Sequence, residues 1–279
     1  MVYDYFSYNG KLLPSRQAVI PLDNIEYAYG FGVYETIRFS HGTAYFLQWH
    51  SGRLLASAKT IGLDHSFPAS FIAAGVEALI TKNGAQACNV KVLLIGGKTR
   101  QQAKLFIQCL PPLFQGKKLY KSGVHLITYR HERDFPRAKT LNMLPSYLAY
   151  RQAQQSDAYD ALFINRSGGI TEGSRTNFLC LGGQTIFSPP EEAILPGIMR
   201  RAVLDFAQKN GFSVARQPIR PEDLAKFEAA FVTSTTSKIL PVKSIDTFVF
   251  GIRPPALLSL MQQFGAHLES MASSGKIQT

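Results

Sequence analysis

The sequence AKTLNMLPSYLAY, residues Ala138–Tyr150, places one lysine at the start of a mostly apolar segment. The pattern after Lys139 predicts a helix. In the ordinary interpretation, Lys139 is a solvated lysine near a helix start. In the alternative, apolar neighbours partly desolvate the lysine, and its free amine attacks a carbonyl to form a Schiff base. The position of Lys139 alone does not decide between the two.

A second candidate lies in the segment GGITEGSRTNFLCL, which holds Glu172. Glycine and serine beside it predict a turn between Ile170 and a strand at Phe178. Glu172 is either an ordinary loop glutamate or a carboxylate that accepts a hydrogen bond from a protonated ring nitrogen and keeps that ring charged.

Two further features favour an anionic ligand. Pro196-Gly197 opens the segment ILPGIMRRAVLDFAQKNG, whose apolar spacing predicts a helix. A helix start with a glycine can present bare backbone N–H groups to an anion, although a plain helix start fits equally well. Residues 233–237 add five consecutive hydroxyl side chains after a predicted strand. A lysine, an acidic partner, a helix N-terminus and a hydroxyl loop together predict pyridoxal 5'-phosphate, a phosphorylated aromatic aldehyde held as an imine.

Length and composition favour a two-domain globular protein. The 279 residues are 46% hydrophobic and 18% charged, which is typical of globular chains. Pro111-Pro112 and the polar residues after them predict a boundary near residue 115, with domains at 1–115 and 116–279. No secretory signal or membrane-spanning segment is evident, so we expect a cytoplasmic location with no membrane partner. The three cysteines are odd in number and far apart, which argues against a disulfide framework and a metal site.

The formal net charge of +11 fits either a nucleic-acid partner or an anionic small molecule. The basic residues are scattered, and no aromatic-basic RNA-binding signature accompanies them. We therefore expect no nucleic acid as a partner.

Strand and helix patterns are mixed along the chain. The sequence FSYNGKLL predicts a hairpin that turns at Asn9-Gly10. Helices are predicted near residues 49–63, 70–82, 198–210 and 255–271, and several strands separate them. Strand runs with separate helices predict an α+β fold.

Six motifs in this order resemble the class IV, or fold type IV, pyridoxal-phosphate enzymes. The resemblance runs from about residue 8 to residue 242, and the motifs read GVYETIR, HSGRLLASA, AKTLNMLPSYLA, ITEGSRTNF, ILPGIMR and TSTTSKILPV. This family includes branched-chain and D-amino-acid aminotransferases and aminodeoxychorismate lyase. The resemblance implies a smaller N-terminal α/β domain, a larger strand-rich C-terminal α/β domain that binds the cofactor, and a homodimer.

The resemblance also assigns roles to individual residues. Lys139 matches the Schiff-base lysine and Glu172 the carboxylate on the pyridine nitrogen. Tyr34 and Arg38 match residues near the substrate carboxylate. The residues implied to bind the cofactor phosphate are Arg53, the backbone of Ile198 and Met199, Thr235 and Thr236. Taken alone, Arg53 is an arginine on the solvated face of an amphipathic helix.

Departures from the family pattern bear on the reaction. Asn24-Ile25-Glu26 and Phe31 replace common residues before the first motif. Met199 stands where many aminotransferases have threonine, a pattern associated with the lyase branch, and no Arg-x-His carboxylate trap is apparent in GGKTRQQAK. The favoured function is an aminotransferase acting on a small amino acid, of the branched-chain or D-amino acid type. The alternative enzyme is aminodeoxychorismate lyase, which releases pyruvate to give 4-aminobenzoate, and a non-catalytic basic binding module is a third interpretation.

Overall fold

The computed structural model describes residues 3–250 and 254–273. The chain forms two compact units. The first comprises Met1–Leu113, Ala138–Met143 and Met271–Thr279, and the second comprises Phe114–Arg137 and Leu144–Ser270. Both helices and strands build each unit, as the α+β prediction requires. Among the described residues, no helix is both long enough and apolar enough to cross a membrane.

The first unit is built on a six-stranded antiparallel sheet in the order β2-β1-β6-β5-β3-β4. Its strands are β1 (Tyr5–Tyr8), β2 (Lys11–Pro14), β3 (Gly32–Ser40), β4 (Thr43–Ala44), β5 (Ala87–Ile95) and β6 (Lys104–Leu110). Its helices are α1 (Ile25–Ala28), α2 (Leu47–Thr60) and α3 (Ala69–Lys82). Asn9 and Gly10 both have positive φ, so the predicted hairpin turn between β1 and β2 is present.

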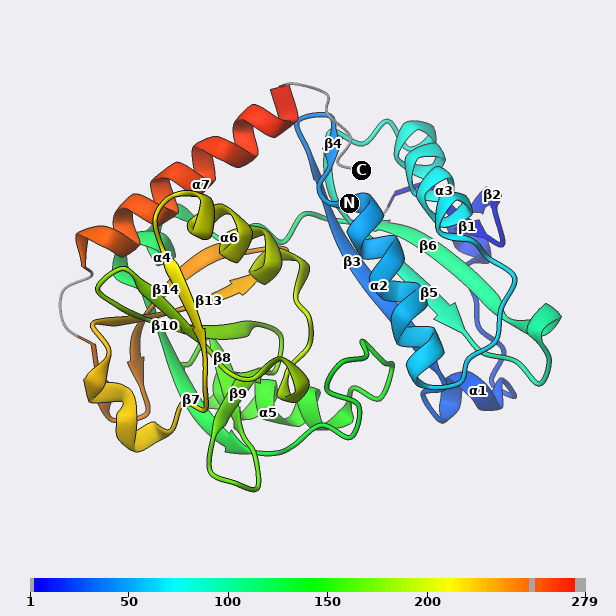
Figure 1. The fold of residues 1–279 in the computed structure, drawn as a ribbon. Helices are drawn as coiled ribbons and strands as arrows, with labels where there is room; N and C mark the ends of the chain where they lie inside the picture. Colours follow the sequence, from blue (N-terminus) through cyan, green and yellow to red (C-terminus); the bar gives the residue numbers. More distant parts are fainter. Residues whose placement is uncertain (1–2, 251–253, 274–279) are drawn as a thin grey trace. The chain divides into compact units, whose positions relative to one another are not determined.

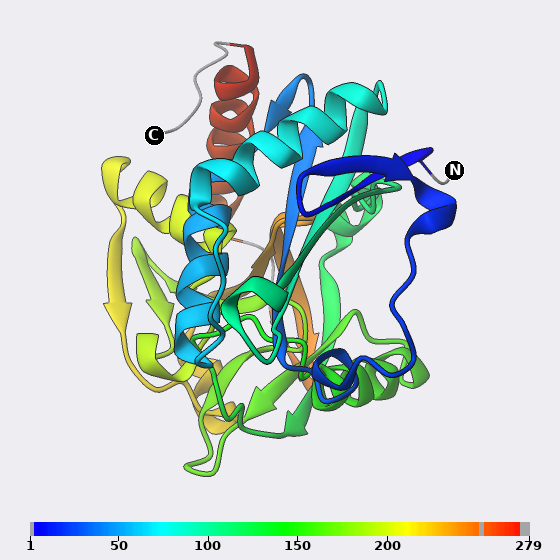
Figure 2. The ribbon, with the colours of Figure 1, turned by 90° about the vertical axis from the view of Figure 1, so that its right-hand side faces the viewer.

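Helices α2 and α3 cover one face of this sheet (Figures 1 and 2). Alternate residues of β3 point toward them, and Val33, Ile37 and Phe39 join their apolar core. Glu35 is also buried on β3 and shares this alternation. The helix-covered face of β3 therefore contains one carboxylate within an apolar row.

The segment that carries Lys139 pairs with β3. Tyr34 N donates a hydrogen bond to Lys139 O at 2.9 Å, and Leu141 N donates to Gly32 O at 2.8 Å. Val33 and Thr140 form an antiparallel bridge between these bonds. A short extended segment from the middle of the chain thus belongs to the sheet of the first unit.

The second unit is built on a nine-stranded mixed sheet in the order β12-β11-β10-β13-β14-β7-β8-β9, with β15 paired to β14. Because β9 also pairs with β10, six of these strands close into a ring. The strands are β7 (Val124–Arg130), β8 (Asp160–Ile164), β9 (Ile170–Gly173), β10 (Asn177–Gly182), β11 (Thr185–Ser188), β12 (Ser213–Arg216), β13 (Ala229–Ser234), β14 (Lys238–Ile245) and β15 (Phe248–Val249). The helices are α4 (Lys117–Ser122), α5 (Leu144–Gln155), α6 (Ile198–Lys209) and α7 (Pro255–Ser273).

Apolar side chains fill the interior of this ring. Leu126, Leu162, Phe178, Val232 and Leu240 come from five of its strands and are almost fully buried. A separate apolar cluster joins the alanines of α5 to β7 and β8.

One predicted site residue lies in a different element from the one expected. Glu172 belongs to strand β9 and is paired with Asn177 of β10, whereas the sequence predicted a turn at this position. The turn comprises residues 174–176, immediately after the strand. The sequence prediction therefore placed this turn two residues too early.

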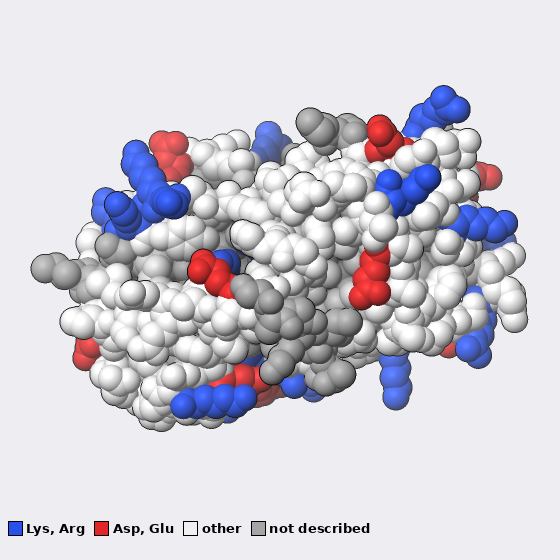
Figure 3. Space-filling model, turned by 90° about the horizontal axis from the view of Figure 1, so that it is seen from above, with Lys and Arg blue, Asp and Glu red and all other residues white. Residues whose placement is uncertain are grey.

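Charged side chains are distributed widely over the surface. On the described residues of the face in Figure 3, lysine and arginine side chains form several separate groups with acidic side chains between them. The described residues of this face form no continuous basic strip of the kind that follows a nucleic-acid backbone.

Candidate functional site

Lys139 is held by its backbone and lies against an aromatic ring. Its N–H donates to Ser57 Oγ of α2 at 3.1 Å, and the preceding Ala138 is 1% exposed. The Lys139 Nζ lies 4.4 Å from the centre of the Tyr34 ring, within the range of a cation–π contact. Strand β3 therefore contacts this lysine through both its backbone and the Tyr34 side chain.

Arg53 of α2 forms a buried ion pair with Glu35 of β3. Arg53 Nε donates to Glu35 Oε1 at 2.7 Å, and Arg53 Nη2 donates to Oε2 at 2.7 Å. His50, one helical turn before Arg53, has its Nδ1 2.7 Å from the same Oε2. Sequence motifs predicted Arg53, but nothing in them indicated that Glu35 and His50 surround its guanidinium.

Burial and charge shift the pKa values of this group in a consistent way. Burial raises the pKa of Glu35, but the Arg53 guanidinium and the His50 ring lower it by a larger amount, so that the pKa is about 2. Burial lowers the pKa of His50, and the Glu35 carboxylate only partly opposes this effect. Near neutral pH, Glu35 is thus ionised and His50 is a neutral ring whose Nδ1–H donates to the carboxylate.

The predicted substrate residues occupy the other face of β3. Tyr34 and Arg38 alternate with the buried Val33, Glu35 and Ile37, so they point away from α2 and α3. Both side chains are partly buried.

In the second unit, three polar groups surround the Glu172 carboxylate. Asn177 Nδ2 and Leu195 N each donate to Glu172 Oε2 at 3.2 Å. Arg133 Nε lies 3.2 Å from Glu172 Oε1. Glu172 is 2% exposed, so these neighbours take the place of water around its carboxyl group. Arg133 and Asn177 were not predicted from sequence, although Asn177 lies within the motif that contains Glu172.

A buried aspartate organises the turn after Glu172. Asp160 Oδ1 accepts from Ser174 Oγ at 2.5 Å, and its Oδ2 accepts from Thr176 Oγ1 at 2.8 Å. The backbone N–H of Arg175 donates to Oδ2 at 3.3 Å. Because Asp160 is fully buried, it fixes the path of the chain from Glu172 to Asn177.

Helix α6 begins beside the Glu172 cluster. Gly197 is its N-cap and supplies no side-chain hydrogen bond, which leaves the first-turn N–H groups without a side-chain cap. Ile198 and Met199, the first two helical residues, are 6% and 4% exposed. A Cβ atom at residue 197 would overlap the Asn177 side chain. The start of α6 and the Glu172 carboxylate therefore share Asn177 as a neighbour.

Thr235 and Thr236 lie in the turn between β13 and β14. Ser234 Oγ is 3.1 Å from Thr236 Oγ1 and 2.8 Å from Ser237 Oγ, so the predicted row of hydroxyls forms a folded turn. At the preceding residue, Thr233 Oγ1 is buried and has no hydrogen-bond partner within the described part of the chain.

Glu172, Asn177 and Thr233 are directly opposite one another on β9, β10 and β13. Residues paired in this way project from the same face of a sheet. The buried hydroxyl of Thr233 therefore shares a face with the Glu172 carboxylate.

The predicted residues form two sets, one within each unit. Lys139, Tyr34, Arg38 and Arg53 gather on or beside β3. In the second unit, Glu172 lies next to the segment that leads into Ile198 and Met199, and Thr235 and Thr236 follow β13.

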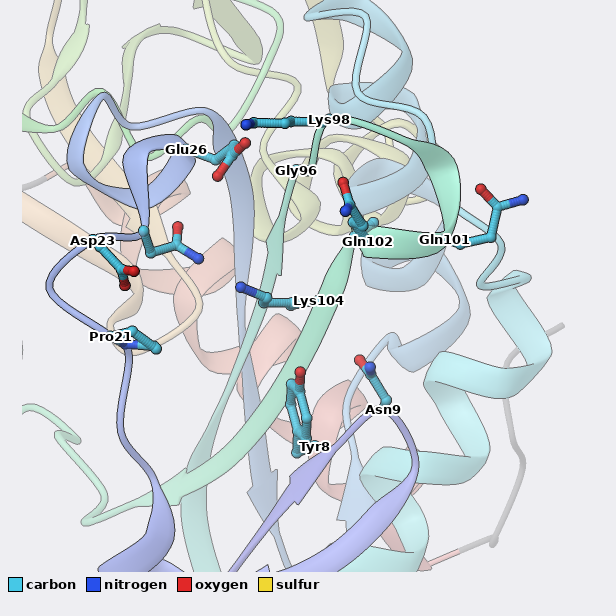
Figure 4. A pocket seen from close by; sticks show the side chains of 13 residues that line it. Tyr8, Asn9, Pro21, Asp23, Glu26, Gly96, Lys98, Gln101, Gln102 and Lys104 are labelled. Carbon is cyan, nitrogen blue, oxygen red and sulfur yellow. The ribbon is translucent and has the colours of Figure 1, made fainter.

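A pocket of about 420 Å³ in the first unit is lined by other residues (Figure 4). Lys98 and Lys104 line it together with Asp23, Glu26 and Tyr8. None of the predicted site residues is among the described residues that form its wall. No sequence motif indicated this pocket.

Comparisons with known proteins give a consistent picture. A family model described as amino-transferase class IV matches residues 32–245. The D-alanine aminotransferase of Bacillus licheniformis is 29% identical over 261 residues, covering 90% of this chain and 92% of that protein. A putative branched-chain-amino-acid aminotransferase of Methanocaldococcus jannaschii is also 29% identical, covering 85% of this chain and 86% of its own.

Solved structures of similar fold include branched-chain aminotransferases. The structure from Thermobaculum terrenum, described as the holo form with PLP, has a TM-score of 0.85 at 23% identity and covers 96% of this chain and 95% of that chain. The structure from Thermoproteus uzoniensis with norvaline has a TM-score of 0.82 at 26% identity and covers 94% of each chain.

Proposed function

Because this chain belongs to the class IV aminotransferase family, we propose that it transfers the amino group of a small amino acid with pyridoxal 5'-phosphate as cofactor. The proposed substrate is of the branched-chain or D-amino acid type, since the similar proteins are named D-alanine and branched-chain-amino-acid aminotransferases. The proposed location is the cytoplasm.

The arrangement around Glu172 is the observation that carries the cofactor assignment. Three groups of the second unit adjoin Asn177: the buried Glu172 carboxylate, the uncapped start of α6 and Thr233. The hydroxyl of Thr233 has no partner among the described residues. These groups suit a flat ligand with a protonated ring nitrogen and a phosphate. When bound, the cofactor supplies an aldehyde and an electron-accepting ring that stabilises charge at the substrate α carbon.

The proposed roles follow from the motifs that the chain shares with the class IV family. Lys139 would hold the cofactor through its aldehyde group, and once the substrate amine had replaced it there, its free amine would carry the substrate α proton. Glu172 accepts a hydrogen bond from the ring nitrogen and keeps it protonated. Tyr34 and Arg38 bind the substrate carboxylate. The residues proposed to bind the phosphate are Arg53, the backbone N–H groups of Ile198 and Met199, Thr235 and Thr236.

Spectroscopy and turnover of the purified protein test this proposal. We expect added pyridoxal 5'-phosphate to give a yellow protein that borohydride bleaches, with the reduced cofactor attached to Lys139 in a peptide mass map. Lys139→Ala should abolish both the label and keto-acid formation from a panel of L- and D-amino acids. Protein that takes up no cofactor, or a Lys139→Ala variant with unchanged turnover, contradicts the proposal.

The lyase alternative rests on Met199, which is buried in the first turn of α6 and has no hydroxyl group. Incubation with aminodeoxychorismate and no amino acceptor separates the two reactions. An aminotransferase releases no pyruvate under these conditions. Stoichiometric pyruvate together with 4-aminobenzoate would instead favour the lyase.

We further propose that the protein acts as a homodimer. An exposed apolar cluster in the segment before β3 supports this, because isolated soluble units seldom expose such groups together. Its members are Leu22, Ile25, Tyr27 and Tyr29, of which Tyr29 is 84% exposed. Light scattering should give about twice the chain mass of 30.9 kDa, whereas a mass of one chain at micromolar concentration would contradict the dimer.

A further inference from the structure

We infer that Glu35 and His50 are positioning residues that orient the Arg53 guanidinium toward the cofactor phosphate. The inference rests on the proposed function, because it takes pyridoxal 5'-phosphate as the anion that Arg53 meets. It adds two residues that would contact neither cofactor nor substrate.

Geometry is the first support. Two parallel bonds of 2.7 Å join Arg53 to Glu35, and this fork fixes both the plane and the direction of the guanidinium. The Arg53 side chain is 9% exposed and that of Glu35 is 1% exposed, so water does not loosen the pair. An arginine held in this way needs little reordering when an anion arrives.

His50 orients the carboxylate in turn. Its ring is 1% exposed, and its Nδ1–H donates to the same Glu35 oxygen that accepts from Arg53 Nη2. Glu35 thus accepts three hydrogen bonds from α2, two from Arg53 and one from His50. Rotation of the carboxylate would break bonds to both partners.

The charge balance supports an anionic ligand. The charged groups that act on His50 are Glu35, Arg53 and Lys139, which are one carboxylate and two cations. This cluster therefore carries one excess positive charge when Lys139 is protonated. A buried ion pair is weak evidence for stability alone, because apolar residues of the same volume often stabilise as well. A charged guanidinium whose plane is fixed by a carboxylate instead suits an anion such as a phosphate.

Strand β3 links this cluster to the lysine. Glu35 and Tyr34 are consecutive and point to opposite faces, so one holds Arg53 while the other lies against Lys139. The backbone of Tyr34 also binds Lys139 O. One strand therefore sets the positions of both the proposed attachment point and the proposed phosphate arginine.

Cofactor discrimination tests the inference, with pyridoxal, which lacks the phosphate, as the comparison ligand. Glu35→Gln should raise the dissociation constant for pyridoxal 5'-phosphate by about 10- to 100-fold, because one charge-assisted hydrogen bond is lost. Its dissociation constant for pyridoxal should stay near that of the wild type. The readout is the absorbance change on cofactor binding to apoprotein, which does not require turnover.

His50 variants keep the test decisive if Glu35→Gln does not fold. His50→Asn retains a donor near the Nδ1 position and should bind both ligands as the wild type does. His50→Leu lacks that donor and should lose affinity for pyridoxal 5'-phosphate alone. Glu77→Gln, an exposed change on α3 of the same unit, is the matched control and should change neither constant.

Two results separate this inference from the proposed function. If the wild type does not bind pyridoxal 5'-phosphate through Lys139, the proposed function fails. If the wild type binds it but Glu35→Gln and His50→Leu leave the ratio of the two dissociation constants unchanged, the positioning role is wrong and the proposed function stands. Equal losses for both ligands also overturn it, because they indicate general damage to the fold.

Discussion

Gly197 leaves room for a cluster of polar contacts because glycine has no side chain. Its backbone lies so close to Asn177 that a methyl group would displace the amide. That amide donates to both Glu172 and the carbonyl oxygen of Leu195. The absence of a side chain at residue 197 thus allows the Glu172 carboxylate and the start of α6 to share one neighbour.

Gly197→Ala should lower the free energy of unfolding by about 1–3 kcal/mol, because an inserted methyl group in a packed site forces its neighbours to move. Urea denaturation of the purified variant measures this change. Gly265→Ala in α7 is the matched control, since no atom lies within 4 Å of its added Cβ. It should raise stability by about 0.5–1 kcal/mol through helix propensity. Equal effects at the two positions would contradict the packing argument.

At the scale of elements, the turn between β9 and β10 depends on a side chain from β8. Asp160 accepts from two hydroxyl groups and from backbone N–H groups of the turn and of its own strand while fully buried. Hydrogen bonds to a buried charge contribute more than exposed ones, because no water replaces them.

Asp160→Asn should therefore cost about 1–3 kcal/mol of unfolding free energy, since an amide nitrogen replaces one accepting oxygen. Asp246→Asn is the matched control. Asp246 also accepts from a backbone N–H and a hydroxyl group, both of Thr128, but these bonds are exposed. Denaturation of the two variants in parallel should show a clearly smaller loss for Asp246→Asn, and similar losses would refute the role of burial.

Several elements could be predicted from local sequence. The hairpin at Asn9-Gly10 and the helices at α2, α3, α6 and α7 have clear turn or periodicity signals, and the class IV family prediction is confirmed. Strand β14 is harder to predict from sequence, because Pro241 lies within it and proline is unusual in a central strand. Its pairing with β7 begins only at Val242, so Pro241 pairs on the β13 side alone.

The candidate site could be predicted only in part, because local sequence marks some of its residues and not others. Lys139, Arg53 and Glu172 lie in recognisable motifs, and their proposed roles stay predictions. Their neighbours Glu35 and Arg133 depend on which strands and loops meet, which local sequence does not encode. Cys88 and Cys109 likewise looked far apart, but they lie on the adjacent strands β5 and β6 as buried free thiols.

At the scale of the whole molecule, each unit contains a carboxyl group with a strongly lowered pKa. Glu35 in the first unit has a pKa of about 2. Burial raises the pKa of Glu191 in the second unit, but Arg200 and Arg216 lower it by a larger amount, so that this pKa is also about 2. Both values lie below the ordinary 4.5, so these groups stabilise the fold fully above pH 4.5 and lose that contribution as the pH falls toward 2.

Histidines with lowered pKa values make the fold sensitive to acid at higher pH as well. Burial lowers the pKa of His50 below 6.5, so the unfolded chain takes up its proton first and stability declines as the pH falls below 6.5. The pKa values of His65, His131 and His267 are lowered as well. All these shifts act in the same direction.

The unfolding free energy, measured by urea titration at a series of pH values, should thus fall steadily from near pH 6.5 toward pH 2. Glu191→Gln should flatten the part of the curve below pH 4.5. Its exposed neighbour supplies the control, Glu192→Gln, which should leave the slope unchanged. Identical slopes for the two variants would show that the arginine pair does not hold Glu191 ionised.

The pairing of Lys139 with β3 has a consequence for biosynthesis. A ribosome completes the strands and helices of residues 1–113 well before it reaches Ala138–Met143, which the same unit contains. The nascent first unit therefore leaves the exit tunnel before the backbone groups of Gly32 and Tyr34 can pair with Leu141 and Lys139. The lysine can join this sheet only after the chain has also produced β7, so the proposed reactive amine is added late to a scaffold that is already translated.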